Sequence, residues 1–356
     1  MSVLKHHLIK KIFSTKTQFS IAITGGGTSA IASLFGVSGA SKTLIDATVP
    51  YHQDALAQFV SASNPQGCNT YTARAMAMTA FMKARAISPK NNVIGIGCTA
   101  AIASERSRMG TDRCHIAVQA ADFTTTYDIE LSKKDDRTSQ ESICQSAILQ
   151  AMAESVNVTT RMSPEKSFRK HITPVPAWAS LLAGNSNSTS TAENSSIFPG
   201  AFNPLHDGHR EMVNIAREIL GQSVTLELSI KNVDKPSLDF LTMLERDTSE
   251  FDLVFTNAPT FLEKSAIFPN SVFVVGLDTI NRIDAPKYYG TELARDQAVK
   301  TMAGRGVSFL VFGRQTDSGF KTLADISISK PLKNLCIGVT EEQFRKDISS
   351  SEIRSK

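Results

Sequence analysis

Residues 197–209 read Ile197-Phe198-Pro199-Gly200-Ala201-Phe202-Asn203-Pro204-Leu205-His206-Asp207-Gly208-His209, and this stretch decides the fold of the second half of the chain. A short apolar run is followed by a turn rich in glycine and proline. From Asp207 to Leu220 the apolar residues then recur at helical spacing. The pattern predicts a strand, a tight turn and a helix in direct succession.

Two histidines flank Asp207-Gly208 at the point where the predicted turn becomes the helix. The first turn of a helix has unpaired backbone N–H groups and the positive end of the helix dipole, which together attract phosphate. His206 and His209 add ring N–H donors, and Gly208 lets the backbone approach a ligand closely. The stretch therefore predicts a polyphosphate site.

The run from Gly200 to His209 resembles the G-x-F-x-P-x-H-x-G-H signature of the HxGH nucleotidyltransferases, and among them the nicotinamide/nicotinate mononucleotide adenylyltransferases. A second signature of this family, I-S-S-T-x-I-R, is similar to residues 348–354, which read Ile-Ser-Ser-Ser-Glu-Ile-Arg. The two motifs follow one another in the family's order. The resemblance implies a Rossmann-like nucleotidyltransferase domain with a parallel sheet over residues 196–356.

The same resemblance implies nucleotidyl transfer from ATP, accompanied by Mg²⁺, to the phosphate of nicotinamide or nicotinate mononucleotide, with release of pyrophosphate, as in NAD biosynthesis. It implies that His206, His209 and Arg354 are catalytic. The residues that it places around ATP and its phosphates are Gly200, Ala201, Phe202, Asn203, Gly208, Gly276, Asp278, Arg314, Ser349, Ser350 and Ser351. Lys231 and Lys235 are added because they follow a predicted strand, where they can meet phosphates.

Hydrophobic strands predicted at residues 224–230, 252–256, 271–279 and 307–312 alternate with helical segments, which favours a parallel sheet covered on both faces. Ligands of such sheets bind beyond the carboxyl ends of the strands. Several of the listed residues follow a predicted strand directly. For the two lysines, a position in a solvated loop is an equal alternative.

The sequence leaves the acceptor open. One alternative is cytidylyl or adenylyl transfer to a different phosphate acceptor, and another is a non-catalytic structural or nucleotide-sensing subunit that retains both folds. We expect ATP and a phosphorylated small molecule as ligands, no nucleic acid, no metal bound by the protein itself, and a homo-oligomer or a larger assembly.

Residues 1–155 form a second predicted α/β domain. Phe19–Thr24 is strand-like, and the glycines that follow, residues 25–27, form either a phosphate cradle or a tight packing turn. A helix is predicted over residues 72–87 and another over 140–153, with strands at 93–97 and 114–118.

This domain resembles the C-terminal domain of CinA, the nicotinamide-nucleotide amidase family, through Gly39-Ala40-Ser41, Tyr51, residues 73–77, Gly95-Ile96-Gly97 and Met109-Gly110-Thr111. The family's chemistry resembles a serine nucleophile with a tyrosine ten positions later and an activating lysine five positions after that. Ser41 and Tyr51 keep this spacing, but Leu56 occupies the lysine position and cannot accept a proton. His52 and Lys42 leave a substitute base open. We predict an amidase-like fold without amidase activity.

Residues 156–195 are predicted to be a linker. Residues 163–176 mix charge with proline, and residues 184–191 contain almost no apolar side chain, which is typical of a flexible tether. Trp178, the only tryptophan, is expected to anchor this segment on one of the domains.

The chain of 356 residues is long enough for two cores, and its net charge of +4 is too small to indicate nucleic acid or an anionic membrane. Five cysteines without a C-x-x-C pair indicate a reducing compartment. We expect a cytoplasmic protein. A location in the mitochondrial matrix is the alternative if residues 1–18 act as a transit peptide, because residues 4–13 are basic and amphipathic. The other interpretation of this segment is a surface helix with Leu4, Leu8, Ile9 and Ile12 inward.

Overall fold

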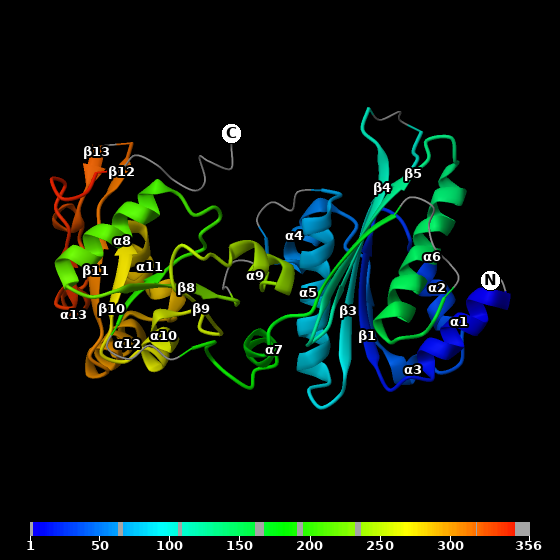
Figure 1. Cartoon of the computed structure of the whole chain (residues 1–356), viewed down its shortest axis with the longest axis horizontal. Helices are drawn as coiled ribbons and strands as arrows, with labels where there is room; N and C mark the ends of the chain where they lie inside the picture. The colour runs from blue at the N-terminus through cyan, green and yellow to red at the C-terminus, as the bar shows by residue number, and fades with distance from the viewer. Residues whose placement is uncertain are drawn as a thin grey trace. The chain divides into compact units, whose positions relative to one another are not determined.

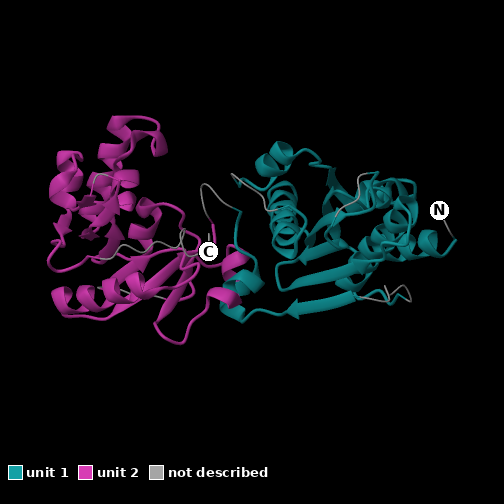
Figure 2. Cartoon of the chain, turned by 90° about the horizontal axis from the view of Figure 1, so that it is seen from above, with its two compact units in different colours: residues 1–179, 232–243 teal, residues 180–231, 244–356 magenta. Residues whose placement is uncertain are grey.

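The computed structural model describes residues 3–62, 67–105, 109–160, 167–190, 195–231, 236–317 and 319–345. The chain divides into two compact units (Figure 2). Unit 1 comprises residues 1–179 and 232–243, and unit 2 comprises residues 180–231 and 244–356. Each unit contains its own six-stranded sheet (Figure 1). The predicted α/β fold is confirmed for both parts of the chain.

The sheet of unit 1 has the strand order β2-β1-β3-β4-β5-β6. Strand β1 is parallel to β2 and β3, whereas each pair from β3 to β6 is antiparallel. Helix α5 (Thr70–Ile87) covers one face, and α1 (Val3–Phe13), α2 (Ser29–Phe35) and α6 (Arg137–Ser155) cover the other (Figure 1). The strands are β1 (Gln18–Thr24), β2 (Leu44–Thr48), β3 (Val93–Ala101), β4 (Asp112–Gln119), β5 (Thr124–Leu131) and β6 (Ser167–Ile172).

Glycines on β3 allow α5 to lie very close to the sheet. A Cβ atom on Gly97 would lie 2.2 Å from the carbonyl oxygen of Ala73 and 2.4 Å from the amide nitrogen of Ala77. A Cβ atom on Gly95 would lie 2.1 Å from the carbonyl oxygen of Ala77. Both glycines and the two alanines are among the residues that carry the CinA resemblance. In this chain, these glycines and alanines form the close contact between strand β3 and helix α5.

We expect Gly97→Ala to lower the free energy of unfolding of unit 1 by about 1–3 kcal/mol, because the helix backbone would have to move away from the strand. Urea unfolding followed by the fluorescence of Trp178 measures this, since Trp178 is 8% exposed in unit 1 and is the sole tryptophan. Gly110→Ala is the matched control, because its Cβ atom would contact only the side chain of Arg113, at 3.9 Å. Equal midpoints for the two variants would contradict the expectation.

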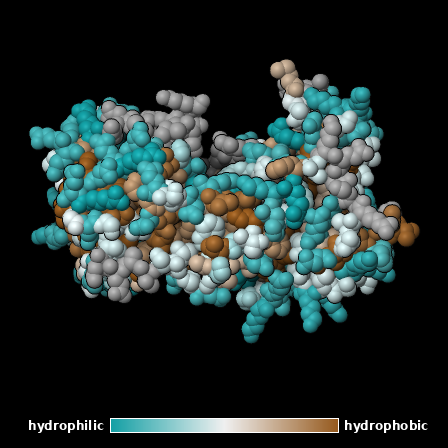
Figure 3. Space-filling model, in the orientation of Figure 1, coloured by the Kyte–Doolittle hydropathy of each residue, from teal (hydrophilic) through white to brown (hydrophobic). Residues whose placement is uncertain are grey.

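The N-terminal helix α1 is part of the core of unit 1. Leu8, Ile9 and Ile12 are buried, as expected for an inward face, but the prediction for Leu4 is wrong because that side chain is 77% exposed. No helix in the described ranges is long and apolar enough to span a membrane. The face of the molecule drawn in Figure 3 is largely hydrophilic, with smaller apolar areas among the polar side chains.

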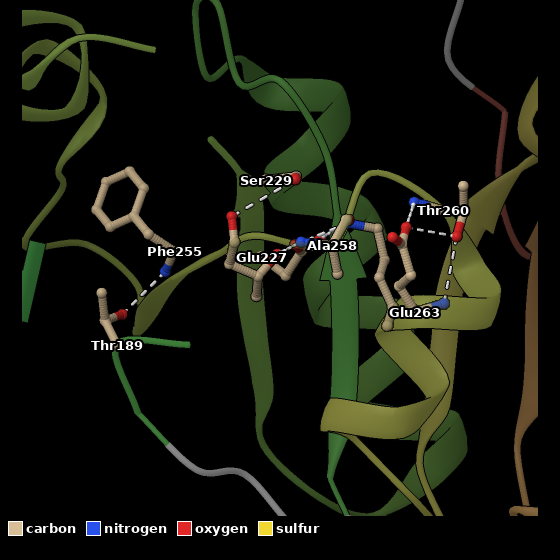
Figure 4. Close-up of polar contacts among 9 residues, drawn as sticks. Thr189, Glu227, Ser229, Phe255, Ala258, Thr260 and Glu263 are labelled. Carbon is tan, nitrogen blue, oxygen red and sulfur yellow. Dashed lines mark hydrogen bonds and ion pairs between the residues drawn. The ribbon is translucent and has the colours of Figure 1, made fainter. Parts of the chain in front are cut away.

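The predicted linker, residues 156–195, differs from the structure over most of its described length. Strand β6 pairs antiparallel with β5, and helix α7 (Pro176–Leu182) follows and buries Trp178. In unit 2, Ser188 forms a bridge with Thr256, and Thr189 exchanges hydrogen bonds with Phe255 (Figure 4). The prediction failed because it judged only side-chain burial, whereas these residues are held by backbone hydrogen bonds at sheet edges.

The sheet of unit 2 has the order β14-β11-β10-β7-β8-β9, and all its strand pairs are parallel. The strands predicted from the sequence are present here. The main elements are β7 (Ser196–Pro199), α8 (Asp207–Leu220), β8 (Val224–Ser229), α9 (Phe240–Arg246), β9 (Leu253–Thr256), α10 (Phe261–Ile267), β10 (Val272–Gly276), α11 (Leu277–Asp284), α12 (Glu292–Gly304), β11 (Ser308–Phe312) and β14 (Cys336–Gly338).

Shorter elements complete the two units. In unit 1 these are α3 (Ala40–Thr43) and α4 (Gln53–Phe59). In unit 2 they are η1 (Pro286–Tyr288), the antiparallel pair β12 (Arg314–Thr316) and β13 (Gly319–Lys321), η2 (Leu323–Asp325) and α13 (Lys330–Lys333).

Candidate nucleotide site

The carboxyl ends of four neighbouring strands of unit 2 present the described candidate residues. In the order β11-β10-β7-β8, these ends lead to Arg314, to Gly276 and Asp278, to the stretch 200–209, and to Lys231. Parallel strands place their carboxyl ends at one edge of a sheet, which is where ligands of such folds bind. Lys235, Ser349, Ser350, Ser351 and Arg354 lie outside the described residues.

The turn after β7 is built around the ring of Phe202. Phe202 is buried and adopts a φ of +43°, in the left-handed region that side chains rarely enter. A Cβ atom on Gly200 would lie 2.6 Å from this ring, so packing requires a glycine there. The ring lies edge-on to Phe198 and to His209, at centroid distances of 5.4 and 5.3 Å. The glycine and the phenylalanine of the motif thus support one of its histidines.

Helix α8 begins with the two histidines in contact. The backbone N–H of His206 donates to Nδ1 of His209 at 3.3 Å, and the two rings stack with centroids 3.7 Å apart. Because Nδ1 of His209 accepts this bond, the neutral ring carries its proton on Nε2. Among the described residues, Nδ1 of His206 is buried and has no hydrogen-bond partner. His209 is therefore arranged as a neutral Nε2–H donor.

Both histidines are less basic than an exposed imidazole. Burial lowers the pKa of His209 to about 4, and the nearby His206 and Arg210 act in the same direction. Burial also lowers the pKa of His206, although Asp207 opposes the shift. Two neutral rings can stack without charge repulsion.

The lowered pKa of His209 makes the stability of the fold depend on pH. The folded protein binds this proton less readily than the unfolded chain, whose histidine has a pKa of 6.5. The contribution of His209 is thus complete above pH 6.5 and is lost as the pH falls toward 4. We expect His209→Asn to lose less stability than the wild type between pH 7.5 and 4.5, because asparagine does not titrate and its Oδ1 can replace Nδ1 as the acceptor.

Urea unfolding at the two pH values measures this difference. His7→Asn is the control, because His7 is exposed and lies in unit 1. If His209→Asn and His7→Asn lose stability equally, the burial of His209 does not govern the acid response.

Asp278 and Arg314, which follow the ends of β10 and β11, form an ion pair. Asp278 lies in the first turn of α11, and Arg314 follows the end of β11. Their side chains are 54% and 50% exposed, and an exposed pair adds little to stability. The pair instead orients the guanidinium group of Arg314 at this edge. A Cβ atom on Gly276 would meet nothing within 4 Å, so protein packing does not require a glycine there.

Two arginines that were not predicted also hold this region. Nη1 of Arg246 donates to the carbonyl oxygen of Ala201 at 2.5 Å, within the turn. Arg210 pairs with both carboxylate oxygens of Glu250, at 2.7 and 3.0 Å, and with Asp207 at 3.0 Å. Arg210 and Asp207 have the local i,i+3 spacing of a helix. The contacts of Arg210 with Glu250 and of Arg246 with Ala201 have no local signal, since these partners are 40 and 45 residues apart in the sequence.

A buried ion pair lies beside the turn (Figure 4). Nζ of Lys264 on α10 donates to both carboxylate oxygens of Glu227 on β8 at 2.7 Å, and the hydroxyl of Thr256 donates to the same carboxylate. The backbone carbonyl of Glu227 accepts from the N–H of Gly200. Strand β8 is an inner strand of the sheet, and the side chain of Glu227 is fully buried.

We expect Lys264→Met to lower the free energy of unfolding of unit 2 by about 3–5 kcal/mol, because it leaves the buried Glu227 without a counter-charge. The double variant Lys264→Met/Glu227→Leu should recover most of this loss. Urea unfolding followed by circular dichroism measures both. Arg345→Met, which breaks an exposed ion pair with Glu341, is the control and should cost less than about 1 kcal/mol.

In unit 1, an internal carboxylate occupies the predicted glycine-rich cradle. Glu141 on α6 accepts from the N–H groups of Gly27 at 2.6 Å and Ser29 at 3.0 Å. A Cβ atom on Gly25 would collide with the carbonyl of Ala100. The structure therefore favours the packing turn over the phosphate cradle.

The amidase-like residues do not form a hydrogen-bonded group. Ser41 lies in α3, before strand β2, and Tyr51 follows that strand, so the two residues are at opposite ends of β2. Leu56 is buried in α4, where it packs among apolar side chains. His52 caps α4, and its Nδ1 accepts from the N–H of Asp54. Within the described part of unit 1, no base lies in hydrogen-bond contact with Ser41.

Comparisons with known proteins find different relatives for the N-terminal and the C-terminal part of the chain. The cytidylyltransferase-like family matches residues 197–356. The C-terminal part of this chain is therefore a cytidylyltransferase-like domain, a class whose general chemistry is nucleotidyl transfer.

Solved structures of CinA proteins are similar to the N-terminal part. The competence/damage inducible protein CihA from Agrobacterium tumefaciens is 18% identical, with 45% of this chain and 100% of that chain covered and a TM-score of 0.36. A CinA superfamily protein from Enterobacter cloacae is 17% identical, with 44% and 93% covered and a TM-score of 0.35. No curated protein matches the chain. At these TM-scores the likeness says nothing about function. Any function of unit 1 has to be argued from its own residues.

Proposed function

We propose that unit 2 transfers the adenylyl group of ATP to the phosphate of nicotinamide or nicotinate mononucleotide and releases pyrophosphate. The observation that carries this proposal is the stacked pair His206–His209, which starts helix α8 at the carboxyl edge of a parallel sheet. A helix start of this kind binds phosphate through its backbone N–H groups. Asp278 and Arg314, which follow the carboxyl ends of the neighbouring strands β10 and β11, extend the polar edge.

In the proposed reaction, an oxygen of the acceptor phosphate attacks the α-phosphorus of ATP in line. The new P–O bond forms as the bond to the bridging α,β-oxygen breaks, and that oxygen leaves with pyrophosphate. The acceptor phosphate is already ionised, so no base is needed. Catalysis comes from positioning and from stabilising the charge on the leaving group. Nε2–H of His209 is the donor that this chain supplies for that charge.

Mg²⁺ is proposed to arrive with the triphosphate. Within the described residues, no group of three or more His, Cys, Asp or Glu side chains could hold a metal ion. Mg²⁺ in nucleotide sites commonly takes most of its ligands from phosphate oxygens and water, with one or two carboxylates. Asp278 is the carboxylate at this edge that fits such a role, and the ion would neutralise phosphate charge.

For unit 1 we propose no amidase activity. Leucine at position 56 cannot act as a base, and its side chain is packed into the core. The nearby His52 uses its Nδ1 lone pair to cap α4.

Two variants of His209 test the proposed function. His209→Asn can retain the acceptor for the N–H of His206 but removes the Nε2–H donor, whereas His209→Gln can place an N–H donor near the position of Nε2. We expect His209→Asn to lower kcat for pyrophosphate release by about 100- to 1000-fold, with a smaller loss for His209→Gln. Both should unfold at urea concentrations close to that of the wild type at pH 7.5.

The assay incubates the full chain with Mg²⁺, with ATP or CTP, and with a panel of acceptors: nicotinamide mononucleotide, nicotinate mononucleotide, phosphopantetheine and phosphocholine. Pyrophosphate formed only with the two pyridine mononucleotides and ATP supports the proposal. Turnover with another pair would reassign the substrates. Absence of pyrophosphate with every pair would overturn the catalytic function.

A further inference from the structure

The segment of residues 246–250, from the last residue of α9 toward strand β9, contacts the candidate site at two points. It belongs to unit 2, as do the turn after β7 and helix α8. Its first residue, Arg246, contacts the turn at Ala201. Its last residue, Glu250, contacts Arg210 in the first part of α8. One short segment therefore holds both parts of the chain that present the two histidines.

The contact of Arg246 fixes a peptide group of the turn. Nη1 of Arg246 donates to the carbonyl oxygen of Ala201 at 2.5 Å. That carbonyl and the nitrogen of Phe202 lie in one planar peptide group, so the direction of the carbonyl constrains the φ angle of Phe202. This angle is +43°, in the left-handed region that a bulky side chain adopts only when its surroundings hold it there. Arg246 is thus one of the contacts that hold the left-handed turn.

The conformation of Phe202 determines in turn where its ring lies. The ring packs edge-on against His209, with the centroids 5.3 Å apart. Nδ1 of His209 accepts from the N–H of His206, so Nε2 of the neutral ring carries the proton that can meet a ligand. A turn that relaxes at Phe202 would remove this support. The effect of Arg246 on the site therefore passes through Phe202 to His209.

The contact of Glu250 holds the helix that begins with the histidines. Nε and Nη2 of Arg210 donate to its two carboxylate oxygens at 2.7 and 3.0 Å, and Nη1 donates to Asp207 at 3.0 Å. The N–H of Glu250 donates to the hydroxyl of Thr248 at 3.1 Å, which fixes the backbone that carries the carboxylate. A guanidinium fork of this kind sets both direction and distance. Because Arg210 and Glu250 are 40% and 41% exposed, the pair adds little to stability and acts on position instead.

We propose that Arg246 and Glu250 are positioning residues of the nucleotide site, which together hold the left-handed turn and the start of α8 so that Nε2–H of His209 faces the phosphates. A strained turn persists only when several contacts fix it, and the N–H of Gly200, bonded to the carbonyl of Glu227, is another of them. The role of the two residues in transfer rests on the proposed function, whereas their hold on the turn does not.

Hydrogen exchange in the full chain, followed by mass spectrometry, tests the hold on the turn. The N–H groups of Gly200 and His206 are hydrogen bonded in the folded turn, so exchange in residues 200–206 reports its opening. We expect Arg246→Met to raise this exchange several-fold, and Arg246→Lys to raise it less, because lysine keeps a donor for the carbonyl. Unchanged exchange in Arg246→Met would overturn the proposal.

The second contact is tested in the same way at the start of α8. We expect Glu250→Gln to raise exchange in residues 207–212, because it removes the charge and one acceptor of the fork. Glu341→Gln is the matched control, since Glu341 forms an ion pair of similar exposure with Arg345. If the two variants exchange equally in residues 207–212, Glu250 has no positioning role.

A core variant separates positioning from general loss of stability. Met302→Ala creates a cavity at a fully buried position on α12. It should lower the unfolding midpoint, measured by circular dichroism in urea, without raising exchange in residues 200–206. Equal exchange in Met302→Ala and Arg246→Met would assign the effect to stability alone and overturn the proposal. Where Arg246→Met does not fold, Arg246→Gln takes its place in every comparison.

Kinetics test the role in transfer where the wild type releases pyrophosphate. We expect Arg246→Met to lower kcat by about 10- to 100-fold, since small misplacements of a site are costly, with a smaller change in KM for ATP. Arg246→Lys should recover most of this loss. A raised KM with unchanged kcat would show that Arg246 binds the substrate directly and would overturn its positioning role. A wild type without activity would contradict the proposed function and leave the exchange results to decide whether the segment holds the turn.

Discussion

The contact between the ring of Phe202 and Gly200 is the constraint on which the nucleotide site depends. The ring fills the space where any other residue at position 200 would carry a Cβ atom, and its edge meets His209. The backbone pays for this placement with a left-handed conformation at Phe202. In this conformation the ring of Phe202 packs against His209, whose Nδ1 accepts a hydrogen bond from the N–H of His206. Only Nε2 of His209 is left to contact a ligand, so these contacts determine which ring nitrogen is the donor.

Polar groups that never meet a ligand hold this turn from two sides. The carbonyl of Glu227 holds the N–H of Gly200, while its carboxylate is paired with Lys264 inside the sheet. The carbonyl of Ala201 is held by Arg246. Buried charges cost solvation energy, and a pair placed this way fixes direction more than it adds stability. The turn therefore depends on residues of β8, α9 and α10 that carry no motif.

The sequence predicts the carboxyl edge of the sheet in unit 2 better than the contacts that hold its turn. Strands β7 to β11 are apolar runs of the right length, and the glycine, phenylalanine and histidines of the first motif are adjacent in the chain. Strand β6 and residues 186–189 were missed because backbone hydrogen bonds hold them and their side chains carry little signal. The ion pair between Glu227 and Lys264 was missed because the two residues are 37 positions apart in the sequence. The contacts of Arg74 with Asp239, of Arg210 with Glu250 and of Arg246 with Ala201 join residues that are distant in sequence, and a local pattern cannot contain them.

The residues of unit 1 that the sequence suggested for a phosphate cradle or an amidase site have structural roles. Glu141 fills the glycine-rich turn, Leu56 belongs to the core, and the Nδ1 lone pair of His52 caps α4. A substrate site needs polar groups that are held in place and can still form a hydrogen bond with a ligand. At the amidase-like positions of unit 1, Leu56 has no polar group and Nδ1 of His52 accepts from the N–H of Asp54. In unit 2, Nδ1 of His209 accepts from the N–H of His206, so the neutral ring presents an N–H donor at Nε2. These contacts favour the start of α8 in unit 2, over the amidase-like positions of unit 1, as the location of the proposed chemistry.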